Sequence, residues 1–386
     1  MDKIVALTPT LQYHRKIVLL GPGNSIHIQR WANSLTARGL KVHLITAHET
    51  LKEIDPNVTV HRLKLSAPWA YLAAQSEVKK FINLIKPDIL NAHYATGYGL
   101  LARNVRFQPT LLSIWGSDVY DFPEKSIFHK WLVRSNLQSA NAIASTSECM
   151  AQKTSSICKT KKIHITPFGV DETIFRPSLI KKESNKITIG TVKSLSKKYG
   201  IDTLIRAFAL ATKQLGTAFN LHLEITGGGQ DEAKLKKLVA RLGIAPAVTF
   251  HGSVPHESVP DMLARLDIFV ALSRDESFGV AAVEAAACGL PVVVSDAAGL
   301  AEVTVHEKTG FVVPRNDHHA AASALVRLIT DANLREEFGR AGQQHVLLNY
   351  TWEKSLDKMI EVYQAVANEH LRAPIVSQCQ HEHPLP

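Results

Sequence analysis

The sequence has no long apolar run and few cysteines, and both absences exclude classes of protein. A membrane-spanning helix needs about 20 predominantly apolar residues, and the 386-residue sequence contains no such run. The cysteines show neither a Cys-x-x-Cys spacing nor another metal-ligand spacing. We therefore expect no membrane span, and we expect reduced thiols at Cys149, Cys158, Cys288 and Cys379.

The start of the sequence also lacks the features of a secretory signal peptide. In MDKIVALTPTLQYHRKIVLL the apolar pieces are short, and Gln12, His14 and Arg15 interrupt them. Together with the expected thiols, this pattern predicts a cytoplasmic protein.

Positive charge is concentrated in the first half of the chain. Residues 1–178 contain 22 Lys and Arg against 12 Asp and Glu, whereas the remainder contains 22 and 23. A basic half favours an anionic partner, which would be nucleic acid, an acidic membrane surface or a phosphorylated substrate. General solubility is the alternative interpretation of the same charge.

Length and pattern predict two similar α/β domains. A chain of 386 residues suits two domains of roughly 150–200 residues. Short Val-, Ile- and Leu-rich runs alternate with helical stretches in both halves, which is typical of parallel strands buried on both faces. Segments 16–23, 88–94, 109–118, 140–146 and 162–169 are each expected to be a strand that runs into a loop, and further strands are expected at 41–46, 186–192, 221–229, 248–252, 267–273 and 291–296.

These elements predict two doubly wound domains that face each other across a cleft. The polar segment 171–186 is the expected linker. We assign residues 1–178 and 186–350 to the domains, 351–372 to a closing helix and 373–386 to a disordered tail. The His-Glu-His of that tail, at 381–383, is interpreted as solvated rather than metal-binding. Ligands of such sheets bind at the carboxyl ends of the strands, so both ligands should lie between the domains.

Two glycine loops follow expected strands. GPGNSI (21–26) has Ile26 in place of the third glycine of a dinucleotide fingerprint, so it predicts a dinucleotide site only weakly. Gly23, in this loop, is a candidate for binding an anion at a helix N-terminus. In TGGGQDEAKL (226–235) Gly228 is a second candidate. Tight turns that require positive φ are the alternative at both loops.

The most informative segment is ESFGVAAVE (276–284), which separates two glutamates by seven residues. A helix expected over 277–287 would place the Cα atoms of Glu276 and Glu284 about 12 Å apart. Carboxyl pairs of glycoside hydrolases lie closer, at roughly 5–9.5 Å. The two carboxylates are therefore expected to contact different parts of one long ligand. A helix-start charge and a solvated helix face are the alternatives, although Glu284 lies in an apolar stretch where a buried carboxylate needs partners.

Free amides at the start of this helix supply the middle of the expected site. The N–H groups of Phe278, Gly279 and Val280 could bind phosphate between the two glutamates. A ligand with hydroxyls at both ends and a diphosphate in the middle fits this layout. A nucleotide sugar has that chemistry.

These residues carry a resemblance to a known family. ESFGVAAVEAAACGLPVVVSDAAG resembles the Glu-x7-Glu segment of the retaining family 4 glycosyltransferases, which have the GT-B fold. The similarity continues in HEKTGFVVP (306–314), FHGSVPHESVPDMLARLDIFVALS (250–273), ITGGGQDEAKL and PFGVDETIFRP (167–177). YTWEKSLDKMIEVY (350–363) is similar to the family's closing helix, which crosses back to the first domain. The resemblance covers nearly the whole chain.

The resemblance implies roles for residues of the second half. Glu284 would bind the donor ribose, Glu276 would contact the transferred sugar, and the amides of 278–280 would hold the diphosphate. An Arg and a Lys five positions apart grip the phosphates in the family, and Lys193 and Lys198 have that spacing here. Lys193 replaces the usual Arg, which leaves a point charge without bidentate contact. Lys197 is the alternative for the second position.

The first half departs more from the family pattern. Trp115 stands where many relatives have a His that contacts the transferred sugar. Trp115 and Asp118 are the candidate acceptor-binding residues, and His93 is a candidate catalytic residue. A structural role for His93 is an equal alternative.

The function implied by the resemblance is retaining transfer of a hexose from a UDP-, GDP- or ADP-sugar. The acceptor would be a glycan or a lipid-linked sugar, in polysaccharide or lipopolysaccharide assembly. No Asp-x-Asp motif is present, so no essential metal or other cofactor is expected. The basic first half would face an anionic membrane rather than nucleic acid, as a peripheral protein. Segment 66–86 mixes Trp, Tyr and Lys in a way that suits interfacial contact, with a packed helix as the alternative.

Three other functions fit parts of the sequence. A nucleotide-sugar epimerase of the same fold would use the same donor site, and donor turnover without acceptor would favour it. A nicotinamide dehydrogenase is disfavoured by Ile26. A non-enzymatic binder of anionic surfaces would explain the basic half but not the two glutamates.

Overall fold

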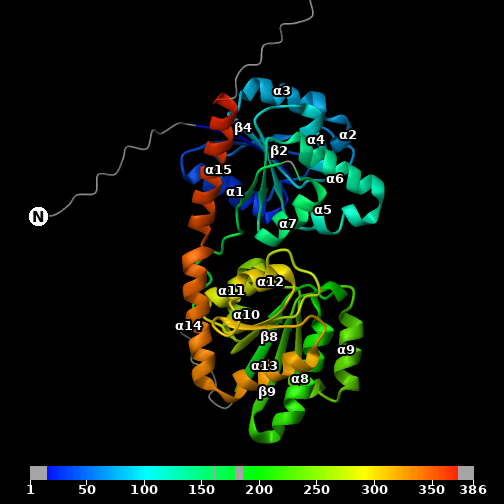
Figure 1. The fold of residues 1–386 in the computed structure, drawn as a ribbon, viewed down its shortest axis with the longest axis vertical. Coiled ribbons are helices and arrows are strands. Elements are labelled where there is room, and N and C mark those ends of the chain that lie inside the picture. Colours follow the sequence, from blue (N-terminus) through cyan, green and yellow to red (C-terminus); the bar gives the residue numbers. More distant parts are fainter. Residues whose placement is uncertain (1–14, 160, 179–185, 373–386) are drawn as a thin grey trace, which may run out of the picture.

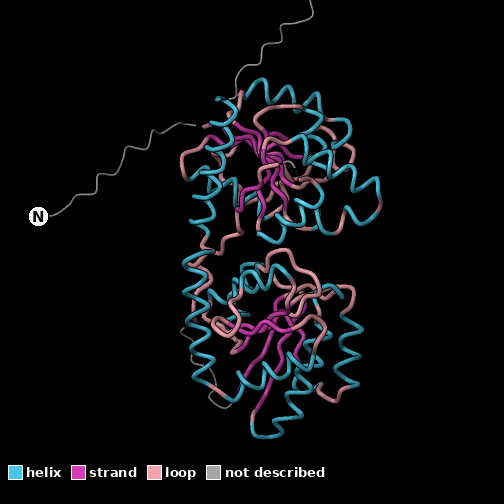
Figure 2. The backbone as a smooth tube through the Cα atoms, viewed as in Figure 1, coloured by secondary structure: helices cyan, strands magenta, loops and turns pink. Residues whose placement is uncertain are grey.

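A computed structural model describes residues 15–159, 161–178 and 186–372 of the chain. Two α/β domains lie one above the other in Figure 1, and Figure 2 shows the strands gathered at the centre of each domain with helices around them. Predictions that fall on 1–14, 179–185 and 373–386, including part of the linker, the tail and Cys379, lie outside the described residues.

The first domain is built on a parallel sheet of seven described strands in the order β3-β2-β1-β4-β5-β6-β7. Its strands are β1 (Lys16–Leu20), β2 (Lys41–Thr46), β3 (Thr59–Arg62), β4 (Ile89–His93), β5 (Thr110–Ile114), β6 (Ala142–Ser145) and β7 (Ile163–Ile165). The helices are α1 (Ile26–Ala37), α2 (Ala70–Ala73), α3 (Gln75–Ile85), α4 (Gly97–Val105), α5 (Ser117–Tyr120), α6 (Ile127–Ser139) and α7 (Glu148–Ile157).

The second domain repeats the plan with six described strands in the order β10-β9-β8-β11-β12-β13. Its strands are β8 (Lys186–Val192), β9 (Asn220–Thr226), β10 (Val248–Gly252), β11 (Ile268–Ala271), β12 (Val292–Ser295) and β13 (Gly310–Val313). The helices are α8 (Ile201–Leu215), α9 (Glu232–Arg241), α10 (Val259–Ala264), α11 (Val280–Ala287), α12 (Ala298–Val303), α13 (His318–Thr330) and α14 (Ala332–Asn349).

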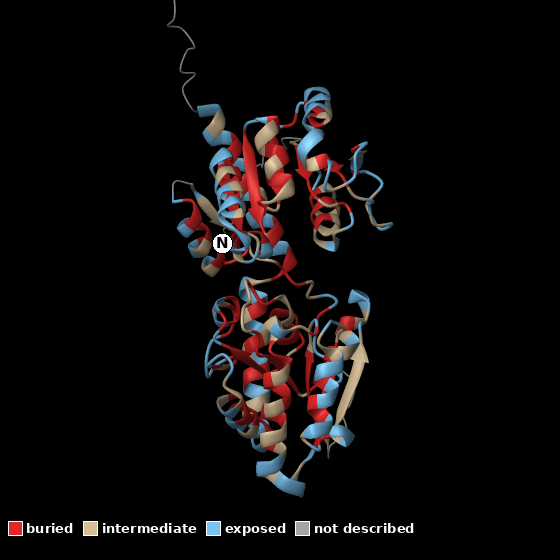
Figure 3. Ribbon diagram, turned by 90° about the vertical axis from the view of Figure 1, so that its right-hand side faces the viewer, coloured by how far each residue is buried: buried red, intermediate tan, exposed pale blue. Residues whose placement is uncertain are grey.

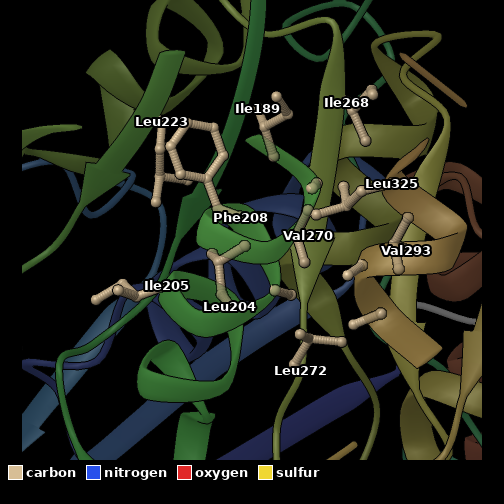
Figure 4. Close-up of a cluster of buried hydrophobic side chains, with 14 of the residues drawn as sticks. Ile189, Leu204, Ile205, Phe208, Leu223, Ile268, Val270, Leu272, Val293 and Leu325 are labelled. Atoms are coloured by element: carbon tan, nitrogen blue, oxygen red, sulfur yellow. The ribbon is translucent and has the colours of Figure 1, made fainter. Parts of the chain in front are cut away.

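Each sheet is covered on both faces, as continuous apolar strands require. In the second domain one core packs β8 and β11 against α8 and α13, with Phe208 and Leu325 among its fully buried side chains (Figure 4). A separate core lies between the opposite face and α10, α11, α12 and α14. Figure 3 shows buried residues along the strands and on the inner faces of the helices.

The last helix, α15 (Trp352–Arg372), crosses back and completes the first domain. Its apolar stripe joins the core formed by α1 and one face of the first sheet. The amide of Asn91 in β4 donates to the hydroxyl of Tyr363 at 2.7 Å, and both side chains are buried. The predicted closing helix is therefore confirmed.

The chain passes between the domains twice, and the two passages lie side by side. Val170 and Thr351 form a parallel bridge between them. The amide of Val170 donates to the carbonyl of Tyr350, and the amide of Trp352 donates to the carbonyl of Val170, both at 2.8 Å.

The structure differs from the expected elements in two respects. The strands β3 and β13 were not expected; β3 is largely exposed and has a polar sequence, so no apolar run marks it. Helix α11 begins at Val280 rather than at 277, because Gly279 takes a left-handed conformation with φ of 103°.

Candidate active site

The residues singled out in the sequence lie around the switch points of the two sheets. In the first sheet the direction of strand order changes between β1 and β4, and in the second it changes between β8 and β11. His93 is the last residue of β4, and the loops that follow β1, β8 and β11 carry Gly23, Lys193 and Glu276. Doubly wound sheets bind their ligands at this position, between diverging loops.

Lys193 and Glu276 are paired at the carboxyl edge of the second sheet. Lys193 Nζ lies 2.6 Å from Glu276 Oε2, and both side chains are largely buried, with 16% and 13% of their surface exposed. The hydroxyl of Ser273 donates to the same Glu276 oxygen at 3.3 Å. The cation and the carboxylate predicted to touch phosphate and sugar therefore occupy one site.

Lys198 lies at the same edge but points toward the other domain. Its Nζ is 3.2 Å from Asp121 Oδ2 of the first domain and 3.5 Å from Asp275 Oδ2. Burial lowers the pKa of Lys198, but the hydrogen bond and charge of Asp121 more than offset it, so the pKa is raised overall. The backbone carbonyl of Lys197, the alternative residue, accepts a hydrogen bond from the guanidinium of Arg274.

The loop that carries these lysines is fixed to the loop that carries Glu276. The guanidinium of Arg274 makes a bidentate contact with the carboxylate of Asp202 in α8: Nη1 donates to Oδ1 at 2.9 Å and Nη2 donates to Oδ2 at 2.8 Å. Gly200, with φ of 66°, lets the chain pass against the carbonyl of Leu272, where a Cβ atom would collide with the backbone. These contacts of Arg274 and Gly200 fix the position of the lysine loop relative to the loop that carries Glu276.

Free amides are present at the start of α11. Within the described chain, no hydrogen bond engages the N–H groups of Phe278, Gly279 or Val280. The side chain of Phe278 is buried in the core, which fixes this turn. Such amides at a helix start can bind phosphate oxygens.

Glu284 lies on α11 with partners that the sequence did not reveal. It is buried, and its Oε1 is 3.2 Å from Nε2 of His256. This hydrogen bond raises the pKa of His256. Arg30 of α1 brings a cation from the first domain: burial lowers its pKa, and the charges of Asp171 and Glu284 act in the opposite direction. Segments far apart in sequence form this group, so spacing alone could not indicate it.

The two candidate glycines have structural roles in this conformation. The amide of Gly23 donates to Thr46 Oγ1 at 2.8 Å, so it is not free for an anion. Gly228 packs where a Cβ would lie 2.5 Å from Ser253 Oγ, and its carbonyl accepts from the amide of Leu195. Neither glycine has positive φ, and in these two loops only Gly227, with φ of 134°, has the conformation that the turn interpretation requires.

His93 and Trp115 belong to an aromatic cluster near the domain interface. His93 is fully buried, and within the described residues neither of its ring nitrogens has a hydrogen-bond partner. Burial lowers the pKa of His93 to about 3. Trp115 lies 5.1 Å from the His93 ring and 5.3 Å from that of His27, between ring centroids. Trp115 therefore packs against His93 within this cluster.

Asp118 is engaged inside the first domain. Its carboxylate is buried and accepts hydrogen bonds from the amides of Ala95, Trp115 and Gly116, at 2.8, 3.1 and 2.9 Å. The side chain joins the loop after β4 to the loop after β5. It is not exposed to an acceptor in this conformation, contrary to the expectation from its place near a strand end.

A pocket that the sequence did not indicate opens in the first domain. Its volume is about 400 Å³, within the range typical of small-molecule sites. It is lined by Pro22, Asn24, Ser25, His48, Tyr71, Tyr94, Thr96, Gly97, Tyr98 and Ser117. Gly116, next to Ser117, faces Ser277, where an added Cβ would lie 2.6 Å from Ser277 Oγ. Ser117, which lines the pocket, therefore directly follows a residue that packs against the loop carrying Glu276.

The two domains touch at the start of α7. The hydroxyl of Ser147 donates to the carbonyl of Ser277 at 2.6 Å. The amides of Glu148 and Cys149 donate to the carboxylate of Glu302 on α12, at 2.8 and 3.0 Å. A helix N-terminus of one domain thus binds an acidic side chain of the other.

The described residues contain neither a membrane-spanning helix nor a cluster of metal ligands. No helix among residues 15–159, 161–178 and 186–372 is both long and apolar enough to cross a bilayer. No group of three or more His, Cys, Asp or Glu in those ranges has a metal-binding arrangement. Cys149, Cys158 and Cys288 are free thiols.

Comparison with known proteins gives consistent matches over both domains. Residues 16–147 match the family described as "Glycosyl transferase 4-like", and residues 171–345 match "Glycosyl transferases group 1". The chain is 24% identical to N-acetyl-alpha-D-glucosaminyl L-malate synthase of Bacillus anthracis, over 87% of this chain and 92% of that protein.

Solved structures share the fold. Sucrose-phosphate synthase from Thermosynechococcus elongatus aligns with a TM-score of 0.77 and 21% identity, over 92% of this chain and 100% of that one. HepE of Anabaena, crystallised with UDP and glucose, aligns with a TM-score of 0.74 and 18% identity, over 91% of this chain and 100% of that one. With matches in both domains and two facing parallel sheets, the chain belongs to the family 4 glycosyltransferases and has the GT-B fold.

Proposed function

We propose that the protein transfers a hexose from a nucleotide-sugar donor to a sugar acceptor with retention of anomeric configuration. The observation that carries this proposal is the grouping of Lys193, Glu276 and the unbonded amides of 278–280 at one edge of the second sheet. Glu284, about one turn along α11, would receive the ribose hydroxyls. HepE, crystallised with UDP and glucose, shares the fold and supports a donor of this class.

The residues present suit stabilisation of a departing diphosphate. Negative charge grows on that group as the bond between sugar and phosphate breaks, and fixed cations and amides stabilise it. Lys193 and the amides are placed to do so, and Lys198 adds a second cation from the same loop. The diphosphate must compete with Glu276 for Lys193, so donor binding would free the carboxylate to contact the sugar.

Proton transfer requires no protein base in this scheme. The leaving phosphate oxygen, on the same face of the sugar as the acceptor hydroxyl, would take the proton. We propose independence from metal ions, because lysines and amides already meet the charge of the diphosphate.

Donor binding and transfer test this function directly. A thermal-shift panel of UDP-, GDP- and ADP-sugars should give stabilisation by one nucleotide class, unchanged by EDTA. Glu276→Gln should retain the nucleotide-induced shift but lose transfer, whereas Glu307→Gln, an exposed control on the second domain, should retain both. No shift with any nucleotide sugar would contradict the proposal, and donor turnover without acceptor would indicate an epimerase.

We further propose that the first domain rests on an anionic membrane at the cytoplasmic side, in assembly of surface polysaccharide or lipopolysaccharide. Ile127, Phe128 and Trp131 of α6 are 90%, 64% and 56% exposed, and the two aromatic rings are stacked. Lys130 and Arg134 are exposed on the same helix. Aromatic and basic side chains on one helix suit the headgroup region of anionic lipid.

Segment 66–86 contributes less to this surface than expected. Helix α3 packs Val78, Ile82 and Ile85 into the core, which is the packed-helix alternative, while Trp69 stays 69% exposed.

Co-sedimentation with phosphatidylglycerol vesicles tests the surface of α6. It should fall in a Phe128→Ser/Trp131→Ser double variant and persist in Leu84→Ser, an exposed control on α3. Equal sedimentation of both variants would contradict this surface.

A further inference from the structure

Lys198 is paired with a carboxylate of the opposite domain that the proposed function does not use. Lys198 Nζ donates to both carboxylate oxygens of Asp121, at 3.4 Å to Oδ1 and 3.2 Å to Oδ2. Asp275, in the second domain, lies 3.5 Å from the same nitrogen. Among the described residues, no other cationic side chain forms an ion pair with Asp121. The second cation expected at the diphosphate is therefore held by an acid of the first domain.

Asp121 is fixed in position by the short helix α5 that precedes it. Its amide donates to the carbonyl of Ser117 at 3.1 Å, which closes the last turn of this helix. Val119 of α5 is fully buried, and the carboxylate of Asp118 accepts hydrogen bonds from three backbone amides. The carboxylate of Asp121 therefore has a defined place on the first domain.

The backbone of Lys198 is fixed on the second domain, whereas its side chain has room to move. Its carbonyl accepts a hydrogen bond from the amide of Arg274 at 2.7 Å. The side chain is 35% exposed, and among the described residues Asp275 is its one ion-pair partner within the second domain. A lysine ammonium is carried on a flexible stem of four carbons. The ammonium can therefore move from Asp121 to a phosphate oxygen while the backbone stays in place.

The pairs of Lys193 and Lys198 differ in what a diphosphate would leave behind. Glu276, 2.6 Å from Lys193 Nζ, is expected to contact the transferred sugar, so the donor gives it a new partner. Asp121 would receive no new partner and would be solvated, because half of its side-chain surface is already exposed. An exposed ion pair is weak, and phosphate oxygens form strong charge-assisted hydrogen bonds. A diphosphate can therefore replace Asp121 at Lys198.

We infer that Asp121 is a positioning residue that competes with the donor diphosphate for Lys198. When a diphosphate binds, Lys198 leaves Asp121 and this bridge between the domains is broken. When the nucleoside diphosphate departs, Asp121 takes the ammonium back. Asp121 thus lowers the affinity for diphosphates and favours their exchange. The inference deepens the proposed function and rests on it for the identity of the diphosphate as the donor.

Calorimetric titration of the full chain measures this competition. The probes are UDP, GDP and ADP, each beside its nucleoside, and inorganic pyrophosphate, which has a diphosphate charge without base or ribose. Asp121→Asn should bind the diphosphate probes about threefold more tightly, the scale of one partly exposed ion pair, and should bind the nucleosides as wild type does. Unchanged or weaker diphosphate binding, or an equal gain for the nucleosides, would overturn the inference.

A double-mutant cycle connects the effect to Lys198. In a Lys198→Met background, Asp121→Asn should no longer change the affinity for diphosphates. A gain of the same size in that background would show that the charge of Asp121 acts at a distance, and it would refute the competition. Glu124→Gln is the matched control, because Glu124 lies close in sequence and pairs with Lys153 of its own domain at 3.0 Å. This control should leave every affinity unchanged.

The outcomes distinguish this inference from the proposed function. If nucleoside diphosphates bind wild type and Asp121→Asn with one affinity, the proposed donor site stands and the competition fails. If no nucleoside diphosphate binds any form, while pyrophosphate still binds Asp121→Asn more tightly than wild type, the proposed donor fails and the competition stands. Because Asp121 is half exposed, Asp121→Asn should melt at nearly the temperature of wild type, which verifies that the variant is folded.

Discussion

At the scale of single residues, Lys193 and Glu276 form a largely buried ion pair, so each side chain offsets the charge of the other where the ligand is expected. Lys193→Ala removes the cation nearest the expected diphosphate and leaves a largely buried carboxylate without its partner. We expect the kcat/KM of transfer to fall about 10²–10³-fold, as for loss of one fixed charge-stabilising group. Steady-state kinetics with the donor found by the thermal-shift panel would measure this.

Two comparisons make the Lys193 prediction specific. Lys193→Arg keeps the charge and should recover most of the activity. Lys236→Ala, which removes an exposed i,i+4 ion pair on α9, should leave kcat/KM unchanged. An active Lys193→Ala enzyme would show that the diphosphate lies elsewhere.

His256 makes stability depend on pH through its hydrogen bond to Glu284. That bond raises the pKa of His256 above its ordinary value of 6.5. The interaction therefore contributes its full stability below pH 6.5 and loses it as pH rises through the raised pKa. The melting temperature of His256→Gln should fall furthest below wild type under acidic conditions. A difference that stays constant with pH would contradict this assignment.

The sequence identified some of these residues and not others, for physical reasons. Glu276, Glu284 and Lys193 could be proposed from the sequence because local spacing and family pattern constrain them. His256 and Arg30 were missed, because their approach to Glu284 depends on how separate loops and domains pack. Gly23 is the converse case, in which the sequence suggested a site that the structure does not offer. Its motif suggested that its amide binds an anion, but that amide donates its hydrogen bond to the hydroxyl of Thr46.

At the scale of elements, Gly200 fixes the loop between β8 and α8. Gly200→Ala would combine left-handed strain with a backbone collision at Leu272 and should cost about 3 kcal/mol. Gly243→Ala is the matched control, because φ there is 70° but nothing lies within 4 Å of the added Cβ. It should cost about 1 kcal/mol. Urea unfolding would measure both, and equal costs would refute the proposed collision.

Some strands were predictable to the residue. β2, β8 and β10 were predicted with the bounds that the structure has, because each is a short run rich in apolar and β-branched residues. β3 lies at an edge of its sheet, is short and has a largely exposed, polar sequence, so no run marks it. The start of α11 depended on the conformation of one glycine, which sequence alone does not specify.

At the scale of the whole molecule, Tyr363 joins the end of the described chain to the centre of the first sheet. Tyr363→Phe would leave the buried amide of Asn91 without its acceptor, which costs about 1–3 kcal/mol. Glu361→Gln, an exposed change on the same helix, should cost less than about 0.5 kcal/mol. Calorimetry should show a lower melting temperature for Tyr363→Phe alone, and identical melting of the two variants would refute the role of this bond.

Apolar periodicity predicted two similar sheets, but the resemblance supplied the closing helix that crosses between them. Contacts such as those of Glu302 with the start of α7 depend on the relative placement of the domains. The sequence pattern around Glu302 and the pattern around the start of α7 do not indicate that placement.

The paired passages at Val170 and Thr351 have a consequence for exchanging parts between relatives. The first domain is not a continuous piece of polypeptide, because α15 from the far end of the chain supplies part of its core. A chimaera that borrows the first domain of another enzyme must therefore take two segments, up to 170 and from 351 onward. A graft of the leading segment alone would join mismatched surfaces along α15.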